Sequence, residues 1–203
     1  MSVKVKICGV TRVADAVAAA RAGADFLGVN FWPGSPRRVT RDAAHAIAAA
    51  VPGVPLVGVF VDAPRAEVLA LVDAVGLSAV QFHGAEDPTY CTGWAVRTIK
   101  ALRPHPGERA ADLAAPYATD WFMLDSFVAG VPGGTGVAVD TSAADGLPRE
   151  RLFVAGGLRP ETVADVVRLM RPYAVDVASG VETRPGEKDH GKLEEFIRRA
   201  KAA

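Results

Sequence analysis

The chain has 203 residues, half of them apolar, which is enough for one domain with a full hydrophobic core. Positive and negative side chains balance at 23 each, whereas a protein that neutralises the phosphates of a nucleic acid normally carries a basic excess. No apolar run reaches the length that crosses a bilayer, and the N-terminus lacks the apolar core of a signal peptide. We therefore expect a cytoplasmic protein with no nucleic-acid partner and no membrane partner.

Short apolar runs alternate with helical patterns along the whole chain. In the first run, residues 3–8, the apolar side chains face one way while Lys4, Lys6 and Cys8 face the other. Seven further runs predict strands at 26–31, 56–61, 79–82, 98–101, 121–125, 152–155 and 175–178. Several of these runs are almost continuously apolar, which is typical of strands covered on both faces.

Amphipathic segments lie between the predicted strands. Apolar residues recur with helical spacing over residues 68–75, 163–170 and 193–200. Three prolines stand where a first helical turn tolerates them, namely Pro64, Pro88 and Pro160. Two glycines stand where a helix is expected to stop, namely Gly23 and Gly76.

A strand, a turn and a helix repeated about eight times predict an α/β protein with a parallel sheet. The main alternative to a closed barrel is an open doubly wound sheet. The strand count, the chain length and a final helix that ends the chain favour a single (β/α)8 TIM barrel with parallel strands. No linker marks a second domain, so we expect one barrel domain over residues 1–203, with an irregular stretch at 103–116.

The active site of such a barrel lies at the C-terminal ends of the strands. Glycines follow the seventh strand at Gly156 and Gly157, and Ser179 and Gly180 follow the eighth. Backbone amides approach an anion closely where no Cβ intervenes, so this corner predicts a phosphate site, although paired glycines also simply turn a chain. Gly134, in the glycine-rich stretch 133–136, is a weaker candidate for a lid or a third phosphate-contacting segment.

Two residues at predicted strand ends suit proton transfer. Cys8 ends the first strand on the face of Lys6, whose ammonium would lower the thiol pKa, although a lone cysteine is usually core. Asp125 follows four apolar residues and is either a helix cap or an acid whose pKa is raised by partial desolvation. Cys91 has no such setting, and we interpret it as structural.

Three more polar residues are candidates for substrate binding. Arg37 lies on a loop where a guanidinium is either solvated or holds a carboxylate by paired hydrogen bonds. His83 either orients a substrate or caps the next helix. Asp176 stands inside the last strand, so it needs a partner, which is a lysine such as Lys4 or Lys6 or a substrate hydroxyl. The few cysteines and histidines show no spacing typical of metal ligands or of a disulfide framework.

Eight short motifs follow one another in order along the chain. They are KICGVT at 6–11, SPR at 35–37, QFHG at 81–84, LDS at 124–126, GGTG at 133–136, AGGL at 155–158, SGVE at 179–182 and PGEKD at 185–189. Each motif alone is modest, but the ordered set closely resembles the phosphoribosylanthranilate isomerase family of tryptophan biosynthesis. The resemblance runs from Val3 to the last predicted helix.

The resemblance implies an Amadori rearrangement of N-(5-phosphoribosyl)anthranilate to 1-(2-carboxyphenylamino)-1-deoxyribulose 5-phosphate, the third step of tryptophan synthesis from chorismate. It implies Cys8 as the general base, Asp125 as the general acid and Arg37 as the group that binds the anthranilate carboxylate. His83 and Asp176 would then lie near the ribose. The phosphate would be held by the glycine corner, with Gly134, Gly156, Gly157, Ser179 and Gly180. No metal and no organic cofactor is implied.

Other functions remain open at this point. An isomerase that also serves histidine biosynthesis would carry an aspartate in place of Cys8. A decayed barrel that only binds phosphosugars would have lost the acid or the base, and both are present. A structural subunit of a larger synthase is a third possibility, although no linker indicates a fusion. The expected partner is a small phosphosugar, and the sequence leaves monomer and homodimer undecided.

Overall fold

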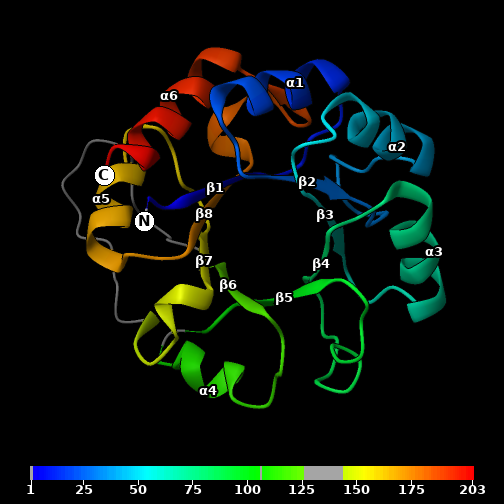
Figure 1. Ribbon diagram of the computed structural model, residues 1–203. Coiled ribbons are helices and arrows are strands. Elements are labelled where there is room, and N and C mark those ends of the chain that lie inside the picture. Colours follow the sequence, from blue (N-terminus) through cyan, green and yellow to red (C-terminus); the bar gives the residue numbers. More distant parts are fainter. Residues whose placement is uncertain (1, 106, 126–143) are drawn as a thin grey trace.

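The computed structural model describes residues 2–105, 107–125 and 144–203. Eight strands pair in chain order into a closed barrel, seen end-on in Figure 1. They are β1 (Lys4–Ile7), β2 (Phe26–Asn30), β3 (Leu56–Phe60), β4 (Ala79–Phe82), β5 (Arg97–Leu102), β6 (Trp121–Asp125), β7 (Leu152–Ala155) and β8 (Ala174–Val177). The predicted α/β TIM barrel is confirmed, and the open sheet is wrong because β1 also pairs in parallel with β8.

The helices surround the barrel on the outside (Figure 1). They are α1 (Val13–Ala22), α2 (Arg41–Ala50), α3 (Arg65–Val75), α4 (Ala110–Ala114), α5 (Val163–Met170) and α6 (His190–Lys201). Short 3-10 turns occur at η2 (Arg149–Arg151) and η3 (Ser179–Val181). Gly23 and Gly76 end α1 and α3 with φ of 93° and 74°, the left-handed conformation that a glycine cap favours.

The two faces of each strand contact different groups, as β1 illustrates. Val5 and Ile7 are fully buried in the main apolar cluster, whereas Lys6, between them, is fully buried beside Asp176 of β8. At the N-terminal ends of the strands, four aromatic rings fill the barrel interior: Phe26, Trp121, Phe153 and Tyr173. Because that end is packed with rings, the polar groups of the interior gather toward the opposite end.

The structure departs from the sequence-based expectations at three connections. The helix expected near Pro88 is wrong: residues 83–96 form turns, and the rings of Tyr90 and Trp94 pack against Phe82 of β4. The irregular stretch at 103–116 contains the short helix α4. After β8 the chain forms an unexpected antiparallel hairpin of β9 (Glu182–Arg184) and β10 (Glu187–Lys188). In the part of the chain that the structure describes, no helix has the length and apolarity to cross a bilayer.

Candidate active site

The predicted site residues come together at the C-terminal mouth of the barrel. Cys8 directly follows β1, His83 directly follows β4, and Asp125 is the last residue of β6. Arg37 lies on the connection between β2 and α2, and its side chain packs against Gly9, the residue that follows Cys8. The predicted Gly134 lies outside the described residues.

The thiol of Cys8 packs against Lys6 and a glycine. The Cys8 amide donates to the carbonyl of Val177 at 2.8 Å, which ties the residue to β8. The space where Gly28 would carry a Cβ lies 2.9 Å from the Cys8 Sγ and 3.1 Å from the Lys6 Nζ. Any side chain at position 28 would therefore push against both groups.

Burial raises the pKa of the Cys8 thiol, and the nearby Lys6 ammonium lowers it by less. Lys6 itself donates to Asp176 at 2.7 Å, and this carboxylate also raises the thiol pKa. The expectation that the Lys6 ammonium would lower the pKa of the Cys8 thiol is thus wrong in its net direction, because burial outweighs the ammonium and the Asp176 carboxylate adds to the rise. The expectation that Asp176 has a lysine partner is confirmed, with Lys6 rather than Lys4.

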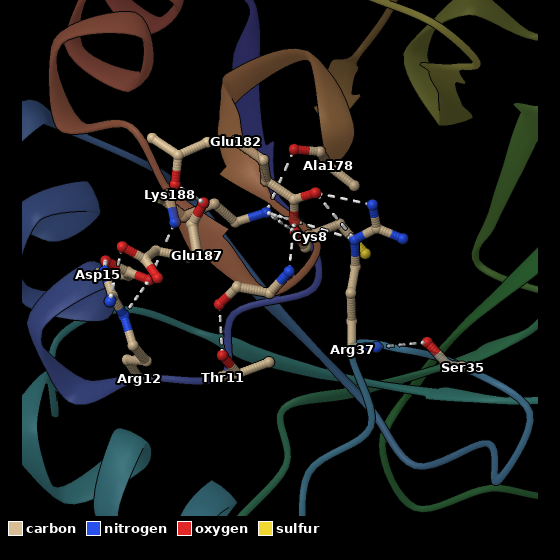
Figure 2. Close-up of polar contacts among 12 residues, drawn as sticks. Cys8, Thr11, Arg12, Asp15, Ser35, Arg37, Ala178, Glu182, Glu187 and Lys188 are labelled. Carbon is tan, nitrogen blue, oxygen red and sulfur yellow. Dashed lines mark hydrogen bonds and ion pairs between the residues drawn. The ribbon is translucent and has the colours of Figure 1, made fainter.

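A second lysine, Lys188 of β10, holds the backbone beneath the thiol. Its buried ammonium donates to the carbonyl of Cys8 at 2.6 Å, to that of Ala178 at 3.2 Å and to Glu182 at 2.8 Å (Figure 2). Burial lowers the pKa of Lys188, and the Glu182 carboxylate opposes that effect. The hairpin that follows β8 is therefore fastened to the end of β1.

Arg37 faces the same carboxylate from the other side (Figure 2). Its Nε donates to Glu182 at 2.9 Å and its Nη2 at 2.7 Å, a bidentate pair that raises the pKa of the guanidinium. Glu182 has a lowered pKa: burial alone would raise it, but Arg37 and Lys188 outweigh burial. The guanidinium group that we expected to bind a substrate carboxylate thus binds a carboxylate of the chain itself.

Asp125 is held by two basic side chains at one of its oxygens. His83 Nε2 lies 2.9 Å from Oδ2, and Arg103 Nε donates to the same oxygen at 3.3 Å. The hydrogen bond from His83 is the largest influence and lowers the pKa of Asp125, while burial opposes it. The expected rise of this pKa by desolvation is wrong, because the histidine and the arginine outweigh the loss of water.

The corner formed by β7 and β8 is built from backbone. Gly156 and Gly157 have φ of 94° and 68°, a region that side-chain-bearing residues rarely adopt. Gly180 packs so closely on the carbonyl of Leu158 that a Cβ would overlap it. Ser179 begins η3 directly beside this glycine. Positive φ at Gly156 and Gly157 and the close approach at Gly180 exclude side chains, so main-chain atoms form this corner.

Sequence reasoning missed four residues that the structure brings to the site. They are Gln81, Arg103, Glu182 and Lys188. Gln81 stands between apolar residues of a buried strand, the same signal that singled out Asp176, and it lies 2.7 Å from the His83 ring. The other three lie on loops or on the unexpected hairpin, where no periodicity indicates which way a side chain points.

The remaining cysteine is not part of this site. Cys91 is buried, and burial raises its pKa to about 11, in agreement with the structural role that its sequence setting predicts. Within the described residues, no cluster of His, Cys, Asp or Glu has the geometry of a metal site.

Comparisons with known proteins identify the family. A family model for N-(5'-phosphoribosyl)anthranilate (PRA) isomerase matches residues 5–199. The N-(5'-phosphoribosyl)anthranilate isomerase of Pseudomonas fluorescens is 48% identical over 97% of each chain, and that of Thiobacillus denitrificans is 47% identical over the full length of both.

Solved structures agree with the sequence comparisons. The phosphoribosylanthranilate isomerase of Thermotoga maritima superposes with a TM-score of 0.85 at 37% identity, covering 99% of this chain and all of that one. A structure of the isomerase in complex with reduced 1-(o-carboxyphenylamino)-1-deoxyribulose 5-phosphate has a TM-score of 0.84 at 36% identity, with the same coverage. On the strength of its ordered motifs, its closed barrel and these matches, the chain belongs to the phosphoribosylanthranilate isomerase family.

Proposed function

We propose that the chain rearranges N-(5-phosphoribosyl)anthranilate, an aldose derivative, to the corresponding ketose, with Asp125 as general acid and Cys8 as general base. The observation that carries this assignment is the order β6-β7-β8-β1 around the barrel. Asp125 ends β6 and Cys8 follows β1, so the glycine corner of β7 and β8 lies between them. A sugar phosphate anchored at that corner extends toward both groups.

The proton transfers follow from the chemistry of the substrate. Asp125 donates a proton to the ring oxygen of the furanose, the bond from C1 to that oxygen breaks, and the nitrogen lone pair forms a C1–N double bond. The thiolate of Cys8 then removes the proton from C2, and the electron pair of that bond forms a C1–C2 double bond as the nitrogen regains its lone pair. Ketonisation of this enolamine delivers a proton to C1 and removes the C2 hydroxyl proton.

The other site residues are proposed to bind rather than to transfer protons. The phosphate is assigned to the corner of Gly156, Gly157, Ser179 and Gly180, with Gly134 as a further contact. The anthranilate carboxylate is assigned to Arg37, where it either meets the outer edge of the guanidinium or replaces Glu182. His83 and Asp176 are assigned to the ribose side.

The proposal also covers the cellular location and the oligomeric state of the enzyme. We infer a cytoplasmic enzyme that acts on a small phosphosugar as a monomer or a homodimer. The Thermotoga maritima relative is dimeric, and monomers have been generated from it, which supports both states as alternatives for this chain.

The direct test is turnover of phosphoribosylanthranilate made in situ, followed by the loss of anthranilate-type fluorescence. We expect activity in the parent chain and a fall in kcat of about 10²- to 10⁴-fold in Cys8→Ser and in Asp125→Asn, the usual share of acid–base catalysis. Cys91→Ala is the matched control, since it removes a cysteine away from the site, and it should keep the parent kcat. Full activity of either site variant would overturn its role, and a folded parent without turnover would overturn the function.

A further inference from the structure

A buried amide lies behind the histidine that contacts the acid. Gln81, in the middle of β4, is 1% exposed and points into the barrel interior beside Met123. We propose that Gln81 is a positioning residue for the isomerisation: its amide group fixes the proton of His83 on Nε2, where it orients the Asp125 carboxyl group. This inference rests on the proposed role of Asp125.

Both hydrogens of the Gln81 amide are used. Its Nε2 lies 2.7 Å from the Nδ1 of His83 and donates to the Sδ of Met123 at 3.3 Å. An amide nitrogen has no lone pair to accept with, so the Nδ1 that faces it must be the acceptor. The imidazole therefore carries its proton on the other nitrogen.

That other nitrogen faces the acid. His83 Nε2 lies 2.9 Å from Asp125 Oδ2, so the hydrogen bond runs from the ring to the carboxylate. The tautomer of an imidazole is set by the partner of its second nitrogen. Gln81 thus determines, through the ring, that Asp125 receives a hydrogen bond at this oxygen.

As a consequence, the two carboxyl oxygens of Asp125 have different roles. Within the described part of the chain, the contacts from His83 and Arg103 both fall on Oδ2, and Oδ1 has none. The described contacts fix the carboxyl group at Oδ2, and we assign the transferable proton to Oδ1. If the His83 proton moved to Nδ1, Nε2 would become an acceptor and would compete for that proton.

The carbonyl oxygen of the Gln81 amide indicates that this position requires the two N–H donors of the amide group. Gln81 Oε1 is buried and lacks a hydrogen-bond partner, the only such side-chain atom among the described residues. A buried carbonyl without a partner is destabilising, and an apolar side chain of similar length would avoid that cost. A space-filling role alone does not account for an amide here, whereas a requirement for its two donors does.

Two substitutions separate positioning from packing. Gln81→Glu keeps the shape but presents an acceptor to Nδ1, and we expect it to move the His83 proton to that nitrogen. Gln81→Met keeps the length and removes both donors, and we expect a mixture of tautomers. In both variants kcat should fall by about 10- to 100-fold while KM changes little, since lost outer partners of a functional histidine have effects of that size at metal sites.

The measurement is ¹⁵N NMR of the His83 ring in the intact chain, alongside steady-state kinetics. Ile99→Val is the matched control, because Ile99 is fully buried in the same interior cluster as Met123 without a polar contact, and its spectrum and kcat should match the parent. A parent spectrum with the proton on Nδ1 would contradict the proposal even if no variant folds.

Parent kcat in both Gln81 variants, or a lowered kcat with the parent tautomer retained, would also overturn it. The ring spectrum needs no turnover, so it can still be read in a parent chain that proves inactive. A failure of the proposed function is thereby distinguished from a failure of this inference.

Discussion

The side of the barrel mouth around Cys8, the proposed base, and the side around Asp125, the proposed acid, are built on different plans. Around Cys8, charges alternate: Lys6 pairs with Asp176, and Glu182 pairs with both Lys188 and Arg37. Around Asp125, the two contacts both come from basic side chains and reach a single oxygen. On the base side every cation contacts a carboxylate of the chain other than the reacting group, whereas on the acid side the carboxylate that both basic groups contact is Asp125 itself.

That difference explains why the two pKa values move in opposite directions. Each cation near the thiol already has a carboxylate partner, so burial prevails and raises the pKa of Cys8. The hydrogen bond from His83, together with the contact from Arg103, outweighs burial, so the pKa of Asp125 is lowered. At neutral pH these two directions favour a protonated thiol and an ionised carboxylate.

This resting state is one proton transfer away from the state that begins the forward reaction. In the proposed mechanism, ring opening needs a protonated Asp125, and removal of the C2 proton needs the Cys8 thiolate. The total number of protons on the pair is already right, and only their distribution differs. In the proposed mechanism, substrate binding must therefore favour the arrangement in which the shared proton lies on Asp125 rather than on Cys8.

The largest expected effect tests whether the network on the base side is needed for folding. Lys188→Met leaves Glu182 buried without its ammonium partner, and loss of one member of a buried pair costs about 3–5 kcal/mol. Lys4→Met is the control, because its pair with Asp25 is exposed and such pairs contribute about 0–1 kcal/mol. Urea unfolding measures both. A Lys188→Met loss no larger than that of Lys4→Met would show that Arg37 alone balances Glu182.

A smaller effect tests whether close packing, rather than charge, positions the base. Gly28→Ala places a methyl group 2.9 Å from the Cys8 Sγ, and displacement of a reacting group by about 1 Å can cost about 10²-fold in rate. Gly58→Ala, on the adjacent strand, meets Leu77 at 2.6 Å and lies away from the thiol.

Both glycine variants should lose about 1–3 kcal/mol of stability through overpacking, as measured by urea unfolding. Only Gly28→Ala should lose kcat in the fluorescence assay. Equal rates in the two variants would contradict a packing role for Gly28.

Sequence reasoning predicted the strands and most of the residues at the barrel mouth, because both depend on the order of neighbouring residues in the chain. Apolar runs set the strands, and a strand end in a parallel barrel puts residues such as Cys8 and Asp125 at the same mouth. It failed at the pKa values, which depend on partners far away in the chain: Asp176 lies 170 residues from Lys6, and Lys188 lies 180 from Cys8. Nothing in the spacing of those residues indicates whether a lysine is already paired.

The smallest expected effect concerns the pH profile of kcat/KM, which reports the pKa values of the acid and the base in the free enzyme. A pair that shares one proton keeps a constant active fraction between its two pKa values. The acid limb should therefore lie below the ordinary value of 3.8 for Asp125, and the alkaline limb above the ordinary value of 9.0 for Cys8.

Between these limits the profile should be flat, apart from the titration of the substrate phosphate near pH ~6. Removing His83 relieves the largest influence on Asp125, so His83→Asn should move the acid limb toward higher pH and leave the alkaline limb in place. A shift of the alkaline limb instead would mean that the two sides of the mouth are coupled, because the histidine would then act on the thiol across the barrel.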